Sequence, residues 1–370
     1  MIIQNVKGGY DFLPKEQKIR NYINGILKNT FEEYGYLPIE TPILCYFDML
    51  AGKYDESNDI LKEIYKLKDQ GDRNLGLRYD LTVPFAKFIA LNKNELKLPF
   101  KRYEINKVFR DGPVKVGRDR EFTQCDVDVV GISNQMIEAE LLSLYVNAFT
   151  KLNIEINIKY NSRKLMRGLI LETGVNEELV SSTITIIDKI DKLTKEELSN
   201  NLIEIGLEEK QIKLLLEYFT LSLEELNIKF TETNNQDIKE GLEELNNLEE
   251  YINKLEITEY CTFTSSLARG QDYYTGNVFE VYERNGKLSG AIGGGGRYDK
   301  MITEFIDDGE IYPAVGISFG LTSIFELLKN REDFKDSSPV DIYIIPMGTN
   351  IESLKLANDL RKLNIKVDIE

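Results

Sequence analysis

The 370-residue chain contains no histidine and no tryptophan, and it has only three cysteines. Without histidine it cannot build a serine-histidine or cysteine-histidine catalytic pair, or a histidine metal site, from its own side chains. Acid-base work would therefore fall to carboxylates, tyrosine or lysine, and charge stabilisation to arginine, lysine or a metal ion. Cys45, Cys125 and Cys261 lie far apart in the sequence, so the pattern indicates neither a disulfide framework nor a metal site of the chain's own.

Other missing features restrict the class of protein further. No run of eighteen apolar residues marks a membrane span, and the first residues lack the basic start and apolar stretch of a signal peptide. Together with the cysteine usage, this predicts a cytoplasmic protein that does not enter a membrane. The formal net charge of -16 argues against nucleic-acid binding over the whole surface, although a local basic path is compatible with an acidic body.

The hydrophobic pattern predicts an α+β fold with an antiparallel sheet flanked by helices. Amphipathic helices are expected over 15–34 and 135–152, with a strand-rich core between them. A region rich in Leu, Glu, Lys and Ile follows, and after a linker over 331–338 a strand-helix-strand pattern begins that is too short for a complete domain. The predicted organisation is an α+β core over 1–172 and 257–330, a helical insertion over 173–256, and the start of an incomplete α/β unit over 339–370.

The clearest polar pattern lies in the predicted strand EFTQCDVDVVG, residues 121–131. Alternation places Gln124, Asp126 and Asp128 on one face of the strand and apolar side chains on the other. Such a row of acceptors suits a binding site, but it equally suits a solvent-facing sheet surface. The pattern alone leaves both interpretations open.

Three further segments carry polar side chains that suit a binding site, and two of them also contain glycine. In LRYDLTVPF, Asp80 and Thr82 are expected on one side of a strand, where they suit an ammonium group or form an edge turn. The loop DGPVKVGRDR after Arg110 is either a phosphate-binding or RNA-binding loop or an exposed hairpin with scattered charge. Four consecutive glycines precede Arg297 and Tyr298, which is costly in a strand unless a ligand or another backbone comes close.

The segment SLARGQDYYTGNVFE, residues 266–280, concentrates an arginine, an aspartate, two tyrosines and two glycines within nine residues. Together with LRYDLTVPF, FKRYEINKVFR, GRDREFTQCDVDVVG, GGGGRYDKM and AVGISFGL in this order, it closely resembles the histidyl-tRNA synthetase family of class II aminoacyl-tRNA synthetases. The resemblance runs from about Val6 to the end of the chain. It implies a class II sheet with a helical insertion and a C-terminal anticodon-binding unit, and a homodimer formed around residues 15–45 with Pro42 at the interface.

The resemblance also implies the substrates and the roles of individual residues. Members of this family join histidine to tRNA(His) through histidyl-adenylate, using ATP and Mg²⁺. Arg110 and Arg269 are the implied catalytic arginines on either side of the reacting phosphate. The implied histidine site comprises Asp80, Thr82, Gln124, Asp128, Arg269, Tyr273, Tyr274 and Tyr298, and the implied ATP site comprises Arg110, Arg118, Arg120 and Phe122.

The chain departs from the family pattern at three positions. Ser323 stands where the family's motif 3 has an arginine for the γ-phosphate, and Gly112 stands where motif 2 has an acid, for which Asp111 is a candidate replacement. Gln271 replaces a usual leucine, which is expected to change packing only. Lys115, Arg118 and Arg120 on the motif 2 loop are the candidates to replace the missing cation.

Two functions of different classes are therefore expected from the sequence. The first is an active histidine–tRNA ligase. The second is a non-catalytic histidine-binding paralogue, such as the regulatory subunit of ATP phosphoribosyltransferase. Ser323 and the short C-terminal unit favour the second, whereas Arg110, Arg269, the basic loop and the anticodon-type unit favour the first.

Overall fold

The computed structural model describes residues 3–52, 60–114, 118–190, 193–269, 273–331, 334 and 340–370. The chain folds into two compact units, Met1–Glu326 and Leu327–Glu370. Within the described residues, no helix is long and apolar enough to cross a membrane.

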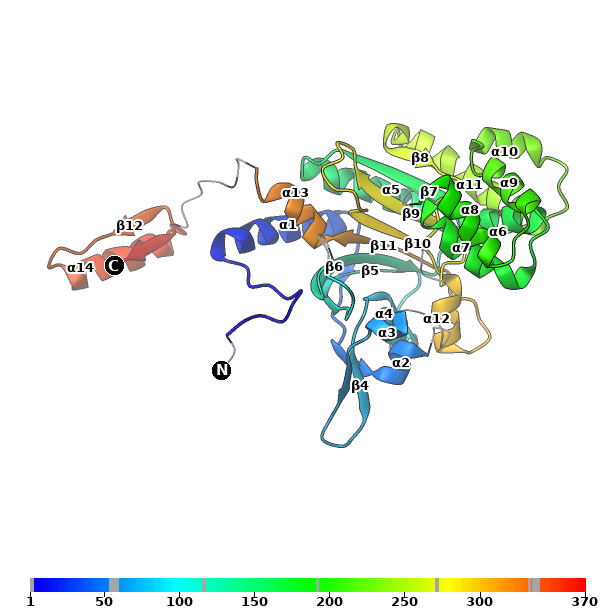
Figure 1. Cartoon of the computed structure of the whole chain (residues 1–370). Helices are drawn as coiled ribbons and strands as arrows, with labels where there is room; N and C mark the ends of the chain where they lie inside the picture. Colours follow the sequence, from blue (N-terminus) through cyan, green and yellow to red (C-terminus); the bar gives the residue numbers. More distant parts are fainter. Residues whose placement is uncertain are drawn as a thin grey trace. The chain divides into compact units, whose positions relative to one another are not determined.

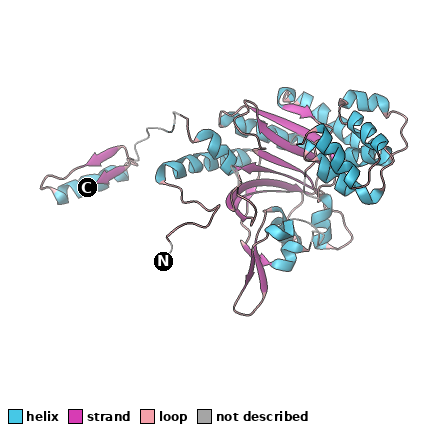
Figure 2. Ribbon diagram, in the orientation of Figure 1, coloured by secondary structure: helices cyan, strands magenta, loops and turns pink. Residues whose placement is uncertain are grey.

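The centre of the first unit is a mixed sheet of eight strands, in the order β1-β5-β6-β11-β10-β9-β7-β8 (Figures 1 and 2). Neighbouring strands are antiparallel from β5 to β7, which confirms the predicted antiparallel sheet, whereas the edge strands β1 and β8 pair in parallel. The strands are β1 (Leu37–Pro38), β5 (Phe100–Phe109), β6 (Glu121–Val130), β7 (Ile156–Ser162), β8 (Cys261–Phe263), β9 (Asn277–Glu283), β10 (Gly293–Arg297) and β11 (Ala314–Gly320).

Two long helices cover the core as the sequence predicts. Helix α1 (Pro14–Glu33) begins at a proline and buries an apolar stripe that includes Ile23, Leu27 and Phe31. Helix α5 (Met136–Lys151) contacts α1, β7 and β11. Phe319 on β11 packs against Phe31 and against Phe149 of α5, which joins both helices to the sheet.

The region between α1 and β5 contains more helix than the sequence predicts. It holds a small antiparallel sheet in the order β2-β4-β3 and three helices. The elements are β2 (Leu44–Tyr46), α2 (Phe47–Ala51), α3 (Ile60–Glu63), β3 (Lys66–Lys68), β4 (Asn74–Leu77) and α4 (Thr82–Asn92). After β10, helix α12 (Asp299–Ile306) packs against α4.

The predicted insertion is helical. Its helices are α7 (Val180–Ile187), α8 (Lys195–Glu204), α9 (Glu209–Tyr218), α10 (Leu223–Lys229) and α11 (Gln236–Lys254), with short 3-10 turns at Glu177–Leu179 and Thr258–Tyr260. Helix α11 packs on α6 (Arg163–Glu172), where Gly241 allows close approach because a Cβ there would lie 2.5 Å from the Leu165 nitrogen. The insertion boundaries at 173 and 256 remain a prediction.

The second unit contains the predicted strand-helix-strand pattern. Strands β12 (Ile342–Ile344) and β13 (Val367–Ile369) pair in parallel, and helix α14 (Asn350–Lys362) connects them and contacts β13. Helix α13 (Leu321–Leu328) crosses the division between the units. The predicted linker at 331–338 lies mostly outside the described residues.

Candidate active site

A cavity of about 450 Å³ in the first unit gathers almost all of the predicted site residues. Polar side chains from β6, from the segment between β4 and α4, and from the segment between β8 and β9 line its walls. The predicted residues on the lining are Asp80, Thr82, Arg110, Arg118, Phe122, Gln124, Asp128, Arg269, Tyr273, Tyr274 and Tyr298. Arg120 is the predicted residue that does not line it.

The acceptor row of β6 faces this cavity and not the solvent. Gln124, Asp126 and Asp128 line it together, while Cys125 and Val127 are fully buried on the opposite face. The alternation therefore predicts the two faces correctly, and the binding-site interpretation of the row is the one that the cavity supports.

Asp80 and Thr82 reach the cavity from a helix start, so the prediction of a strand here is wrong. Strand β4 ends at Leu77, and Thr82 begins α4. The Asp80 carboxylate accepts a hydrogen bond from the Val83 N–H at 3.0 Å, which satisfies one of the free amides of the first helical turn. Its other oxygen, Oδ2, is buried without a hydrogen-bond partner in the described structure. Burial raises the pKa of Asp80 despite the Val83 N–H and Arg110.

Asp128 is held between a tyrosine and an arginine. The Tyr298 hydroxyl donates a hydrogen bond to Oδ1, and the Arg102 Nη2 lies 2.7 Å from Oδ2. Burial raises the pKa of Asp128, while Arg102 and Tyr298 oppose that shift. Gly316 on the neighbouring strand makes room for the carboxylate, because a Cβ there would lie 1.8 Å from Oδ1.

Asp126 and Ser318 belong to the same wall; the sequence places Asp126 in the row of acceptors without a specific role and does not single out Ser318. The Gln124 amide donates to the Ser318 hydroxyl at 3.2 Å, while its Oε1 is buried without a partner in the described structure. Burial raises the pKa of Asp126 to about 8, Arg102 opposes the shift, and Asp128 adds to it. The β5–β6 register places Glu104 opposite Asp126, so several buried acids lie close together.

Arg269 and Tyr274 form the opposite wall, against the glycine strand β10. The Arg269 Nη1 donates to the Phe279 carbonyl at 3.0 Å and lies 3.6 Å from the Glu280 carboxylate. A Cβ on Gly294 would lie 1.8 Å from the Arg269 Nη1, and a Cβ on Gly296 would lie 2.8 Å from the Tyr274 ring. Glycine is therefore needed at these positions because other groups of the protein come close to the strand, as expected. Those groups are side chains as well as backbone. Gln271 lies outside the described residues.

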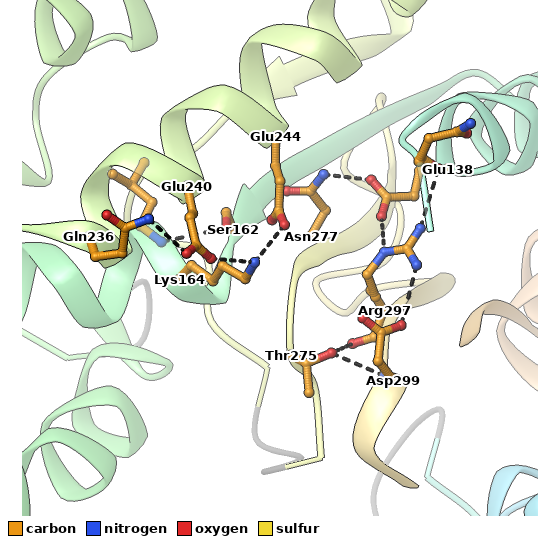
Figure 3. A network of polar contacts seen from close by, with 12 residues as sticks. Glu138, Ser162, Lys164, Gln236, Glu240, Glu244, Thr275, Asn277, Arg297 and Asp299 are labelled. Atoms are coloured by element: carbon orange, nitrogen blue, oxygen red, sulfur yellow. Dashed lines mark hydrogen bonds and ion pairs between the residues drawn. The ribbon is translucent and has the colours of Figure 1, made fainter. Parts of the chain in front are cut away.

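A network of polar contacts includes residues that are next to Tyr274 and Tyr298 in the sequence (Figure 3). Arg297 donates to Glu138 of α5 at 2.6 Å and to Asp299 at 3.3 Å, and the Asp299 N–H donates to the Thr275 hydroxyl. Asn277 donates to the second oxygen of Glu138. The network fixes Arg297 and Asp299 on either side of Tyr298, and it fixes Thr275 directly after Tyr274. In the same view Lys164 pairs with two glutamates of α11, Glu240 and Glu244, both at 2.8 Å.

The other end of the cavity is basic and more open. The Arg110 guanidinium lies 4.2 Å from the centre of the Tyr79 ring and 5.0 Å from that of Phe122, and its Nε donates to the Tyr79 carbonyl. Arg118 is exposed and contributes to the lining. Such an end suits a polyphosphate.

The motif 2 loop differs in two ways from what the sequence predicts. Arg120 pairs with Asp111 at 3.2 Å and donates to the Gly112 carbonyl, so it joins the two ends of the loop, and Lys115 lies outside the described residues. The space beside Gly112 is taken by Glu63, whose carboxylate oxygen would lie 3.0 Å from a Cβ there. Glu63 lies on the cavity lining, and only the fold brings it to this loop. Ser323, in the first turn of α13, also lines this end.

Comparisons with known proteins show the family of the chain. The family model described as histidyl-tRNA synthetase matches residues 8–324. Histidine–tRNA ligase 1 of Bacillus cereus is 45% identical over all of this chain and 85% of its own length. Histidine–tRNA ligase 2 of Shouchella clausii is 41% identical over 99% of this chain and 87% of its own.

Solved structures agree with the fold. Histidyl-tRNA synthetase from Nostoc superposes with a TM-score of 0.85 at 28% identity, covering all of this chain and 86% of the other. A Bacillus halodurans protein described as an ATP phosphoribosyltransferase regulatory subunit/histidyl-tRNA synthetase has a TM-score of 0.84 at 22% identity, covering all of this chain and 93% of the other, and shows the fold alone. On the family match and the identity to these ligases, the chain belongs to the histidyl-tRNA synthetase family.

Proposed function

We propose that this protein is a histidine–tRNA ligase, which activates histidine with ATP and transfers it to tRNA(His). The observation that carries the proposal is one cavity with two chemically different ends, an enclosed acidic end and an open basic end. A small cationic amino acid suits the first end and a polyphosphate suits the second. The 45% identity to proteins named histidine–tRNA ligase supports the same activity.

At the acidic end, the free Oδ2 of Asp80 and the free Oε1 of Gln124 would accept hydrogen bonds from the histidine ammonium group. Thr82 lines the same part of the wall. Asp128 would accept a hydrogen bond from one ring nitrogen, and a tyrosine hydroxyl from Tyr274 or Tyr298 would meet the other. A site that bonds both ring nitrogens rejects analogues that lack them, because its own buried polar groups would then be unpaired.

At the junction of the two ends, Arg110 and Arg269 would flank the reacting phosphate. The histidine carboxylate oxygen forms a bond to the α-phosphorus of ATP, and the bond to the bridging oxygen breaks, so that pyrophosphate leaves with its electron pair. Both arginines would stabilise the negative charge that develops on the equatorial oxygens, while the cavity walls position the carboxylate. Tyr273, beside Tyr274, completes the wall near Arg269.

The nucleotide would occupy the basic end with Arg118 and Phe122, as the Mg²⁺ complex. Mg²⁺ is usually held by phosphate oxygens, waters and one or two carboxylates, and Glu280 and Glu63 are carboxylates on the cavity lining. The tRNA acceptor end would enter past the motif 2 loop, and 339–370 would belong to an anticodon-binding unit. The working protein would be a cytoplasmic homodimer joined around residues 15–45, and light scattering at micromolar concentration tests that dimer.

A histidine-binding sensor without ligase activity is the second candidate, and Ser323 is the observation that favours it. Histidine-dependent exchange of pyrophosphate into ATP separates the two functions. We expect measurable exchange and subsequent charging of tRNA(His). Histidine binding without exchange, with no exchange restored by Ser323→Arg, would contradict the ligase and leave the sensor.

A further inference from the structure

Arg102 is a completely buried cation directly behind the acidic end of the cavity. Its side chain is 0% exposed, and it extends from β5 opposite Asp128 in the β5–β6 register. Its Nη2 lies 2.7 Å from Asp128 Oδ2 and 3.4 Å from the Leu81 carbonyl, and its guanidinium covers the Phe85 ring at 4.3 Å. Arg102 is not on the cavity lining, so it would act on a ligand only through another residue.

A second buried arginine, Arg78, has a structural role and serves as a comparison. Arg78 donates to the Lys107 carbonyl, the Thr41 carbonyl, the Thr41 hydroxyl and Glu104, at 2.7 to 3.1 Å. It therefore joins three segments of backbone. Arg102 leaves both Nε and Nη1 without hydrogen-bond partners in the described structure, whereas Arg78 leaves only Nη2. Because unpaired buried donors are costly, the fold alone gives little reason for an arginine at this position.

The carboxylates around Arg102 supply a functional reason. Asp80, Asp126 and Asp128 lie buried on the cavity wall, with exposed fractions of 3%, 4% and 3%. Glu104 is already paired with Arg78. Without a cation behind them, ionisation of each aspartate would oppose ionisation of the others, and a protonated Asp128 would lose its charge for the imidazole ring.

We propose that Arg102 is a positioning residue for histidine recognition, which keeps Asp128 ionised and turned toward the ring of the substrate. The inference rests on the proposed function, since it takes histidine as the ligand of the acidic end. The Tyr298 hydroxyl donates a hydrogen bond to one oxygen of Asp128, and the Arg102 Nη2 forms an ion pair with the other, which makes no hydrogen bond in the described structure. The two contacts restrain the carboxylate, and the same arginine opposes the rise in the pKa of Asp126 that burial causes beside it.

The test measures histidine binding by calorimetry in the full-length protein, without ATP. Arg102→Met keeps the bulk over Phe85 and removes the charge, and we expect affinity to fall about 100-fold at pH 7. Arg102→Lys, which keeps the charge, should recover part of that loss. The Michaelis constant for ATP in pyrophosphate exchange should stay within about threefold of the native value.

A double-mutant cycle with Asp128→Asn tests whether Arg102 acts through that carboxylate. In Asp128→Asn no charge remains at position 128 for Arg102 to hold, so Arg102→Met should cost less histidine affinity in that background than in the native one. An equal or larger loss there, or native affinity in folded Arg102→Met, would overturn the role of Arg102. If the native protein itself fails to bind histidine, the proposed function fails instead, so the two failures are distinguishable.

Discussion

The two ends of the cavity are built in opposite ways. At the acidic end, Asp80, Asp128 and Tyr298 are almost fully buried, and each is held by a hydrogen bond from or to a neighbouring element. At the basic end, Arg118 is exposed and Arg110 is only partly buried. A buried, fixed end can discriminate between small ligands, because each unpaired polar atom there is costly. An open end with solvated cations holds a charged ligand by attraction and tolerates substitution.

This contrast explains why Ser323 need not abolish activity. A missing cation at the open end can be replaced by Mg²⁺, water or another arginine, since solvent reaches that region. A missing group at the buried end has no such substitute. Loss of a side chain should therefore reduce ligand binding most at the acidic end, whereas loss of Arg110, which would touch the reacting phosphate, should reduce the rate.

Asp128→Ala should give the largest effect on binding. It removes the partner of Arg102 and leaves that guanidinium buried without a counter-charge, so histidine affinity should fall by about 3 kcal/mol, or more than 100-fold. Calorimetry measures this directly. The matched control is Glu121→Ala on the same strand, since Glu121 pairs with Lys107 at the surface and is not on the cavity lining. Equal affinity of the native and Asp128→Ala proteins would remove Asp128 from the site.

Arg110→Ala should give the largest effect on turnover. Loss of one cation from a developing phosphate charge usually reduces the rate about 100- to 1,000-fold. We expect that reduction in pyrophosphate exchange, with histidine affinity changed by less than about threefold. Lys107→Ala, on the strand that precedes Arg110 but outside the cavity lining, is the control. A parallel loss of histidine affinity and exchange would mean that the two ends are not separate.

Gly316→Ala should reduce stability and histidine affinity by adding a single methyl group at the acidic end. The added Cβ would lie 1.8 Å from Asp128 Oδ1, so the carboxylate must move. Overpacking of this kind costs about 1–3 kcal/mol of stability, and histidine affinity should fall about tenfold. Gly290→Ala is the control, because nothing lies within 4 Å of a Cβ at that position. Thermal unfolding and calorimetry on both variants would show whether the buried end is as rigid as the contacts indicate.

Ser323→Arg should raise pyrophosphate exchange by about tenfold or less, because the open end already has other sources of positive charge. Ser323→Ala is the neutral control. A gain much larger than tenfold would show that the basic end is as dependent on single groups as the acidic end, and the contrast would fail.

The smallest expected effect is on the pH dependence of stability. Because the folded protein holds the Asp126 proton up to about pH 8 and the unfolded chain releases it near pH 4, the free energy of unfolding should fall as pH rises between these values. In Asp126→Asn this contribution is absent, so the fall in Tm from pH 5.5 to 8 should be smaller by about 2 °C or more. The chain has no histidine, so no imidazole of its own titrates in this range. If Tm depends on pH in the same way in Asp126→Asn and in the native protein, the ionisation that causes the dependence belongs to another group.

Periodicity predicted the elements of the fold that have a long amphipathic or alternating pattern. The helices over 15–34 and 135–152 and the strand over 121–131 are found within one residue of the predicted bounds. The prediction of a strand at Asp80 and Thr82 is wrong, because two polar residues spaced by two are compatible with the start of a helix as well as with a strand. There the hydrogen bond from Val83 to Asp80 decides the local structure.

The site was predictable where its residues belong to local motifs, and not where the fold alone brings residues together. Asp128, Arg269 and Tyr298 came from recognisable segments. The sequence around Arg102 and around Glu63 does not indicate a site. Arg102 lies in a predicted strand like its neighbours. Glu63 lies in a four-residue helix that is far in sequence from the loop that it contacts. Arg120 was placed in the ATP site because spacing along a loop does not reveal which arginine turns inward.

Strand β10 also bears on how the site can change by mutation. Along Gly293–Gly296 the pocket floor is bare backbone, and any side chain at the last three positions would meet another group within 3 Å. No substitution at these positions would therefore change the shape of the pocket without a steric clash. A search for variants that accept other amino acids should leave this strand constant and randomise the side-chain walls, Gln124 and Tyr274 in particular.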